Sequence, residues 1–102
     1  MALHFGGDVL IVTLEEAKKY LKVDSDIEDT DIQDLIDVAE EFIKNATGKT
    51  FDGTNKLAKF VIRVLITDWH ENPNNFGRTD HVFNVIKGYI AQLSCCYNEV
   101  SP

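Results

Sequence analysis

Residues 30–46 read TDIQDLIDVAEEFIKNA, and this stretch decides the fold. Its apolar side chains recur every three or four residues, which places them on one stripe of an α-helix. The stripe consists of Ile32, Leu35, Ile36, Ala39, Phe42, Ile43 and Ala46. Acids gather at the start, where the helix dipole favours negative charge, and Gly48 follows the last turn as a left-handed cap would. We therefore expect one long amphipathic helix here.

Three further helices are expected around this one. Thr13-Leu14-Glu15-Glu16 has the spacing of a capping box, which predicts a short helix over about residues 14–22. Two more are expected at about residues 55–71, ending before Pro73, and from Thr79 or Asp80 to about Tyr97. The fold class is therefore all-α, a compact bundle of about four helices with a short first helix and three longer ones.

The chain has 102 residues, a length that fits one domain. We assign residues 13–98 to a single helical domain. Residues 1–12 are expected to form a leader, with Gly6-Gly7 as a flexible joint, and residues 99–102 a C-terminal tail.

The third expected helix carries apolar residues on more than one stripe of its surface. Either it is the central helix, wrapped by the others, or part of it meets a neighbouring subunit. For the second alternative the candidate contacts are Ile62, Ile66 and, in the following loop, Phe76.

The net charge of −7, from 17 acids and 10 Lys and Arg, disfavours tight binding to nucleic acid. Binding to an anionic membrane surface is disfavoured for the same reason. No apolar stretch approaches the roughly 20 residues that a membrane span needs. Cys95 and Cys96 are neighbours, so we expect two reduced, partly buried thiols rather than a disulfide framework.

No motif in the chain is complete enough to predict a catalytic, cofactor or metal site. Gly48-Lys49-Thr50 resembles the end of a P-loop, but Ile43 stands where the first glycine belongs. Asp24, Asp26 and Glu28 alternate like a calcium loop, but Asp29 stands at the position of its required glycine. His70-Glu71 resembles the start of a zinc-binding helix motif, but Asn74 stands where the second histidine belongs. We therefore expect no enzyme and no cofactor.

Residues 24–41 hold nine acids and no Lys or Arg. Such a run is commonly just a solvated helix face; otherwise it is a negative surface that repels DNA or meets a basic partner. The candidate acids for that surface are Asp24, Asp26, Glu28, Asp29, Asp31, Asp34 and Asp37.

Three segments of the chain together resemble the head–tail connector family of tailed phages and prophages. The first is Val12–Asp24, with its Thr-Leu-Glu-Glu-Ala-Lys helix and acidic connection. The second is Asp31–Ile43, closing on Thr47-Gly48, and the third is Val64–Asn72. The residues after position 72 depart from the family pattern, because the usual Leu-Pro pair before the last helix is replaced by Thr79-Asp80-His81-Val82.

The resemblance implies a structural role without catalytic residues. Family members are helical subunits that assemble as a dodecameric ring beneath the portal protein. The ring extends the DNA channel, through which DNA passes without specific binding, and docks a tail-side stopper or completion protein. The expected location is the head–tail junction of the virion, assembled in the bacterial host cytoplasm. The acidic run would then face the lumen or a partner.

A second hypothesis comes from another functional class. The chain could instead be a small acidic helical adaptor or regulator that binds one basic protein partner through residues 24–41.

Overall fold

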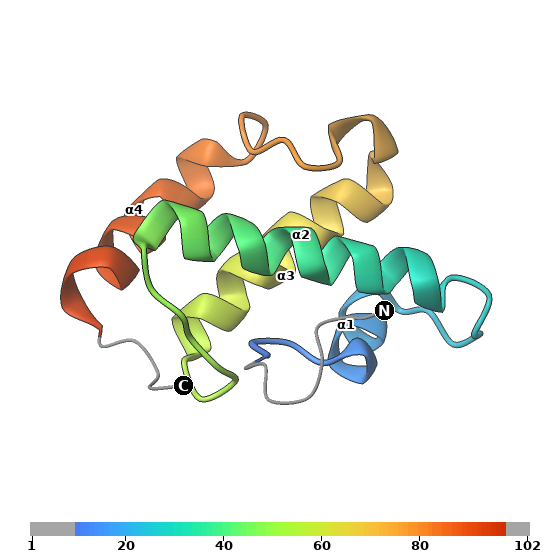
Figure 1. Ribbon diagram of the computed structural model, residues 1–102. Helices are drawn as coiled ribbons and strands as arrows, with labels where there is room; N and C mark the ends of the chain where they lie inside the picture. The colour runs from blue at the N-terminus through green and yellow to red at the C-terminus, as the bar shows by residue number, and fades with distance from the viewer. Residues whose placement is uncertain (1–9, 98–102) are drawn as a thin grey trace.

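The computed structural model describes residues 10–97, which form four α-helices and one short 3-10 helix. In chain order they are α1 (Leu14–Leu21), α2 (Asp29–Thr47), α3 (Lys56–Glu71), η1 (Pro73–Asn75) and α4 (Phe83–Cys96). Residues 10–97 contain no strand. The all-α architecture, with a short first helix and three longer ones, is therefore confirmed (Figure 1).

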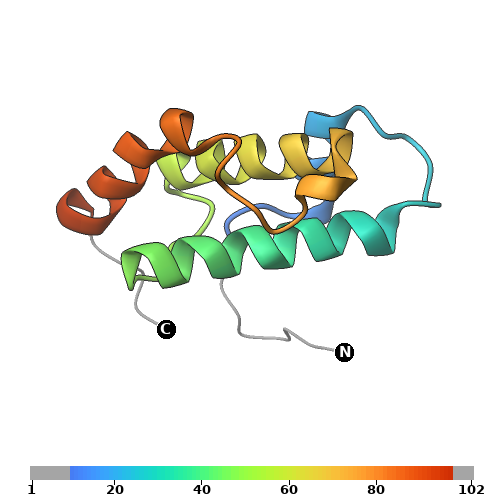
Figure 2. The same cartoon turned by 90° about the horizontal axis from the view of Figure 1, so that it is seen from above.

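Helix α3 occupies the centre of the bundle. It packs against α1, α2, η1 and α4, and Figures 1 and 2 show α2 running beside it in the opposite direction. Six apolar side chains of α3 are buried: Ala58, Val61, Ile62, Leu65, Ile66 and Trp69. The wide apolar surface of this helix is thus used inside the domain, because neighbours cover it from several sides.

Helix α2 buries the stripe that its periodicity predicts. Ile32, Leu35, Ile36, Ala39 and Ile43 are buried, while Ala46 in the last turn is exposed. Gly48 ends the helix at φ 71°, and its N–H donates to the Lys44 carbonyl at 2.8 Å. Only a residue that tolerates the left-handed region closes a helix in this way without strain, which explains the glycine.

The predicted capping box of α1 is present. The Glu16 N–H donates to the Thr13 hydroxyl at 3.2 Å, and the Thr13 N–H donates to the Glu16 carboxylate at 3.0 Å. Two backbone donors are satisfied reciprocally, so the helix starts where the sequence predicts. Helix α3 also has a side-chain cap, since Asn55 accepts from the Ala58 N–H at 2.9 Å.

The core begins earlier than residue 13. Ile11 and Val12, which the sequence analysis assigned to a leader, are 4% and 1% exposed. Their N–H groups donate to Glu40 on α2 at 2.9 and 3.3 Å, which fixes this segment against the helix. Residues 1–9 of the expected leader, including Gly6-Gly7, and residues 98–102 lie outside the described residues.

Helix α4 begins at Phe83, three to four residues later than expected, and η1 was not expected at all. The delay has a tertiary cause. The Trp69 indole N–H donates to the Arg78 carbonyl at 2.8 Å, and the His81 ring lies 2.7 Å from the Asp68 carboxylate. Both contacts hold the loop of residues 76–82 over the end of α3, so the chain starts its helix only after the loop.

Candidate functional site

The acidic run of residues 24–41 does not form one uniform face. Several of its carboxylates bind groups of the same chain. Glu28 lies 2.9 Å from the His70 ring, and Asp29 lies 2.8 Å from the Lys18 ammonium. Lys18 also contacts Asp26 at 3.2 Å. These acids tie the loop between α1 and α2 to its neighbours, so part of the run serves the fold.

Lys18 is the cation around which that loop is organised. Its side chain is only 16% exposed, while that of Asp26 is 92% exposed. The hydrogen bond to Asp29, and secondarily the one to Asp26, raises the pKa of the Lys18 ammonium above its usual value. A favourable charge pairing stabilises the charged form.

Asp31 and Asp34 line a groove between α2, the end of α3 and η1. The groove has a volume of about 270 Å³. Its apolar lining comes from Leu35, Trp69, Pro73 and Phe76, and its polar lining from Glu28, Asp31, Asp34 and His70. Asp31 and Asp34 are exposed, and their side chains make no hydrogen bond or ion pair within residues 10–97. The groove therefore combines an apolar floor with a negatively charged rim.

Phe76 is the part of this floor that a partner can reach. Its ring is 44% exposed and packs edge-on against Trp69, with 5.6 Å between the ring centroids. Trp69 is 1% exposed, so it supports the Phe76 ring from below. Phe76, one of the three expected contact residues, therefore has an aromatic ring that a partner could contact.

The other two expected contact residues, Ile62 and Ile66, are not at the surface of the domain. Ile62 and Ile66 are both fully buried in this chain, because their side of α3 packs inside the bundle. They have no surface to offer a neighbouring subunit while the domain keeps this fold.

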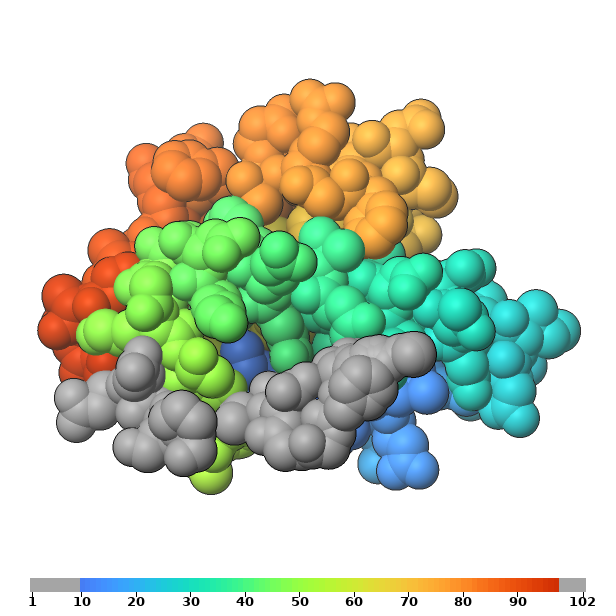
Figure 3. Space-filling model, in the orientation of Figure 1, coloured from blue at the N-terminus to red at the C-terminus, as the bar shows by residue number. Residues whose placement is uncertain are grey.

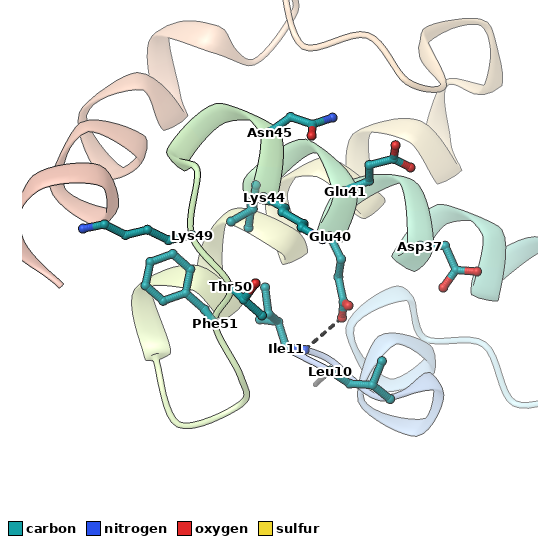
Figure 4. Close-up of a pocket in the computed structure, with 11 residues that line it drawn as sticks. Leu10, Ile11, Asp37, Glu40, Glu41, Lys44, Asn45, Lys49, Thr50 and Phe51 are labelled. Atoms are coloured by element: carbon teal, nitrogen blue, oxygen red, sulfur yellow. Dashed lines mark hydrogen bonds between the residues drawn. The ribbon is translucent and has the colours of Figure 1, made fainter. Parts of the chain in front are cut away.

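Asp37, Glu40 and Glu41 lie along a second groove, on the side of α2 that meets Leu10 and Ile11 (Figure 4). Its volume is about 480 Å³. Figure 4 shows Glu40 turned toward Ile11, in keeping with its hydrogen bonds to the backbone there.

Asp37 and Glu41 stand one turn apart on α2; Asp37 is half-buried and accepts from the Gln33 amide at 3.0 Å, while Glu41 is exposed. We call this pair the acidic ridge. In Figure 3, α2 forms the middle of the visible face, so this helix presents a broad surface to its surroundings.

Asp68 carries a buried carboxylate that was not among the residues predicted from the sequence; its side chain is 6% exposed. Its oxygens contact the His81 ring at 2.7 Å, the Asn72 amide at 3.3 Å and the Asn75 amide at 3.5 Å. One signal was available: Asp68 follows Val61 and Leu65 at helical spacing, so a charged residue occupies an apolar position.

Helix α4 is the least covered of the four helices. Only Ile86 and Leu93 are buried, whereas Phe83 and Val85 are 52% and 53% exposed. Lys87 is the single charged residue in the helix.

Cys95 and Cys96 are both free and exposed, not partly buried as expected. The side-chain hydrogen bond with Cys95, which favours the protonated form, is the main cause that raises the pKa of the Cys96 thiol.

Within residues 10–97, no three histidine, cysteine or carboxylate side chains come together in a way that could hold a metal ion. No helix in this described range has the length and apolarity required to cross a membrane.

The comparisons with known proteins found one family. A family model described as phage gp6-like head-tail connector protein matches residues 11–91. The match starts at Ile11, where the core begins, and includes α1, α2, α3 and more than half of α4. No curated protein and no solved structure matches the chain.

Proposed function

The chain belongs to the phage gp6-like head-tail connector family, and from that premise we propose that it is a ring-forming subunit below the portal. Membership gives a structural role in the connection between phage head and tail. The finer statements are proposals: copies of the chain form a closed ring, dodecameric as in the family it resembles. The ring contacts the portal protein on one side and a tail-side stopper or completion protein on the other.

One observation carries this proposal: the family match covers residues 11–91, nearly the whole described domain. The distribution of exposed side chains supports it. Several large apolar residues remain exposed on different elements, including Ile27 at 90%, Phe60 at 42% and Phe83 at 52%. Exposed apolar side chains on several faces suit a subunit that contacts more than one neighbour.

We further propose that the acidic ridge of Asp37 and Glu41 faces the DNA channel. DNA carries a dense negative charge and binds proteins mainly where Lys and Arg replace its counterions. A lumen lined by carboxylates repels the phosphates and so lets the duplex slide without being held. Net charge −7 agrees with such a surface.

Binding to the portal tests the proposal. Purified chain is mixed with portal rings of the same phage or prophage, and the complex is measured by sedimentation and mass photometry. We expect several copies of the chain to bind each portal ring. A chain that ignores portal rings but forms a stable 1:1 complex with one basic protein would favour the adaptor hypothesis instead.

A further inference from the structure

The groove lined by Asp31, Asp34 and Phe76 has a counterpart on α4 of the same chain. Phe83 and Lys87 stand four residues apart on α4, so they share one side of the helix. Phe83 is 52% exposed and Lys87 is also exposed. Lys87 has no hydrogen-bond or ion-pair partner within residues 10–97. We call these two residues the α4 knob.

We propose that the α4 knob of one copy docks into the groove of a second copy of this chain. In this contact the Phe83 ring packs on Phe76, while the Lys87 ammonium binds Asp31 and Asp34. The proposal rests on the proposed self-assembly and names the surfaces through which it occurs.

Charge complementarity is the first argument for a second copy as the occupant. Asp31 and Asp34 are like charges three residues apart on α2, so each raises the electrostatic energy of the other. A cation placed between them removes this repulsion. The α4 knob brings one cation on a helix that has no other charged residue, so no acid of α4 opposes the approach.

The apolar parts also match. Aromatic residues are enriched at the centre of protein interfaces, whereas charged residues such as lysine lie mostly at the polar rim, so Phe83 suits the centre of the contact and the Lys87 ammonium its rim. The lysine stem adds apolar contact while its ammonium reaches the acids at the rim. Pro73 and Leu35 extend the floor beside Phe76, so the groove offers apolar surface for both the ring and the stem.

The contact has the symmetry that a ring requires. Groove and knob belong to different elements: the groove to α2, α3 and η1, the knob to the start of α4 (Figure 1). A contact between two different surfaces is heterologous, and repeated heterologous contacts close into a ring when the rotation allows it. Asp37 and Glu41 take no part in the contact, so the proposed docking does not cover the acidic ridge.

Disulfide cross-linking between separately labelled chains tests this docking. All variants carry Cys95→Ser and Cys96→Ser, which remove two exposed thiols. One chain carries Asp34→Cys and the other Lys87→Cys; the matched control chain carries Glu41→Cys on the ridge of the same helix. Each pair is mixed and oxidised, both alone and on portal rings, because a template raises the local concentration.

We expect the Asp34→Cys and Lys87→Cys chains to cross-link with each other several-fold more than either does with itself. The Glu41→Cys control should cross-link poorly with Lys87→Cys. Equal yields for all pairs, both alone and on portal rings, would overturn the docking. If several copies still bind each portal ring in that case, the proposed function stands and only the surfaces are wrong.

A charge exchange gives an independent readout. Asp34→Lys or Lys87→Glu alone should weaken association of the copies, and the double variant should restore it, because the charges are then exchanged across the contact. Both substitutions are at exposed positions, so the fold should be retained in all three variants. If Asp34→Lys loses portal binding while the copies associate normally, the groove binds the portal and the proposal is wrong.

Discussion

At the scale of single residues, Asp68 is the polar side chain on which the end of α3 depends. Its carboxylate is buried on the apolar side of α3, and the His81 ring and two asparagine amides contact its oxygens. A buried charge is tolerated when it is hydrogen-bonded, and removing one partner leaves the others unsatisfied. Asp68 thus links the core to the loop that leads into α4.

The Asp68→Ala variant should lower the free energy of unfolding by about 2 kcal/mol, because a buried hydrogen-bonded network loses its acceptor. Urea unfolding followed by circular dichroism measures this. Asp80→Ala is the matched control, since that carboxylate contacts the exposed Arg78 side chain at the surface. We expect little change there; equal losses in the two variants would show that Asp68 has no special role.

Glu16 connects α1 to α3 through Lys59, and it completes the capping box with Thr13. The hydrogen bond from Lys59, followed by the one from the Thr13 N–H, lowers the pKa of the Glu16 carboxyl below its usual value of 4.5. A lowered pKa in the folded state means that this carboxylate stabilises the fold above pH 4.5. The stabilisation is lost as the pH falls through the lower, folded-state pKa.

The Glu16→Gln variant should therefore be less stable than the wild-type chain at neutral pH. The difference should shrink as the pH falls below 4.5, where the wild-type carboxylate becomes protonated. Urea unfolding at a series of pH values measures both curves. Glu15→Gln, on the neighbouring position, serves as the control. A gap between the Glu16 curves that stays constant with pH would contradict the pairing.

At the scale of the elements, α4 is the helix that its own sequence supports least. It begins at Phe83, its N-cap residue Val82 makes no side-chain cap hydrogen bond, and only two of its residues are buried. Gly88 lies in its interior, where a glycine costs helix stability relative to alanine. A Cβ atom added there would meet nothing within 4 Å.

The Gly88→Ala variant should stabilise the isolated chain by roughly 0.5–1 kcal/mol, because alanine loses less conformational freedom in a helix. Gly48→Ala provides the opposite case. That site also has open space, but its φ of 71° is strained for alanine, so the chain should be destabilised. Thermal unfolding of both variants measures the pair; a shift in the same direction would refute the conformational argument.

The sequence predicted α1, α2 and α3 within one or two residues because their start and stop signals are local. The Thr13–Glu16 box and Gly48 act within a few residues of chain. The start of α4 could not be predicted in this way, since it depends on contacts of Trp69 and Asp68 with the loop. Likewise, periodicity marks Ile62 and Ile66 as apolar but cannot tell burial within one chain from burial between chains.

The acidic residues show the same limit. Their number and spacing can be read from the chain, but their partners cannot. Asp29 pairs with Lys18 and Glu28 with His70, across separations of 11 and 42 residues. Only the folded arrangement separates these acids from Asp31 and Asp34, which remain without a partner within residues 10–97.

At the scale of the whole molecule, the domain combines one buried core with several different exposed surfaces. Helix α3 buries most of its apolar side chains inside the bundle. Much of α4, the groove and the acidic ridge lie at the surface of the domain. A chain of the head-tail connector family needs such a division, because one stable core must support several contacts at once.

Neutralising the ridge with Asp37→Asn and Glu41→Gln should leave assembly intact but slow DNA passage or weaken DNA retention, because the channel wall loses its repulsion. Particle yield and packaged DNA content measure the effect, and electron microscopy checks that particles still assemble. Glu15→Gln, at an exposed position on α1, is a charge-neutralising comparison away from the ridge. Normal yield and normal DNA content for the ridge variant would argue against a lumen position.

The central claim is that this chain is a connector subunit between portal and tail. Electron cryomicroscopy of particles from the phage or prophage that encodes it tests the claim most directly. We expect a ring of four-helix domains directly below the portal, with the acidic ridges of α2 turned toward the channel. A head–tail junction in which no copy of this domain fits the density would contradict the claim.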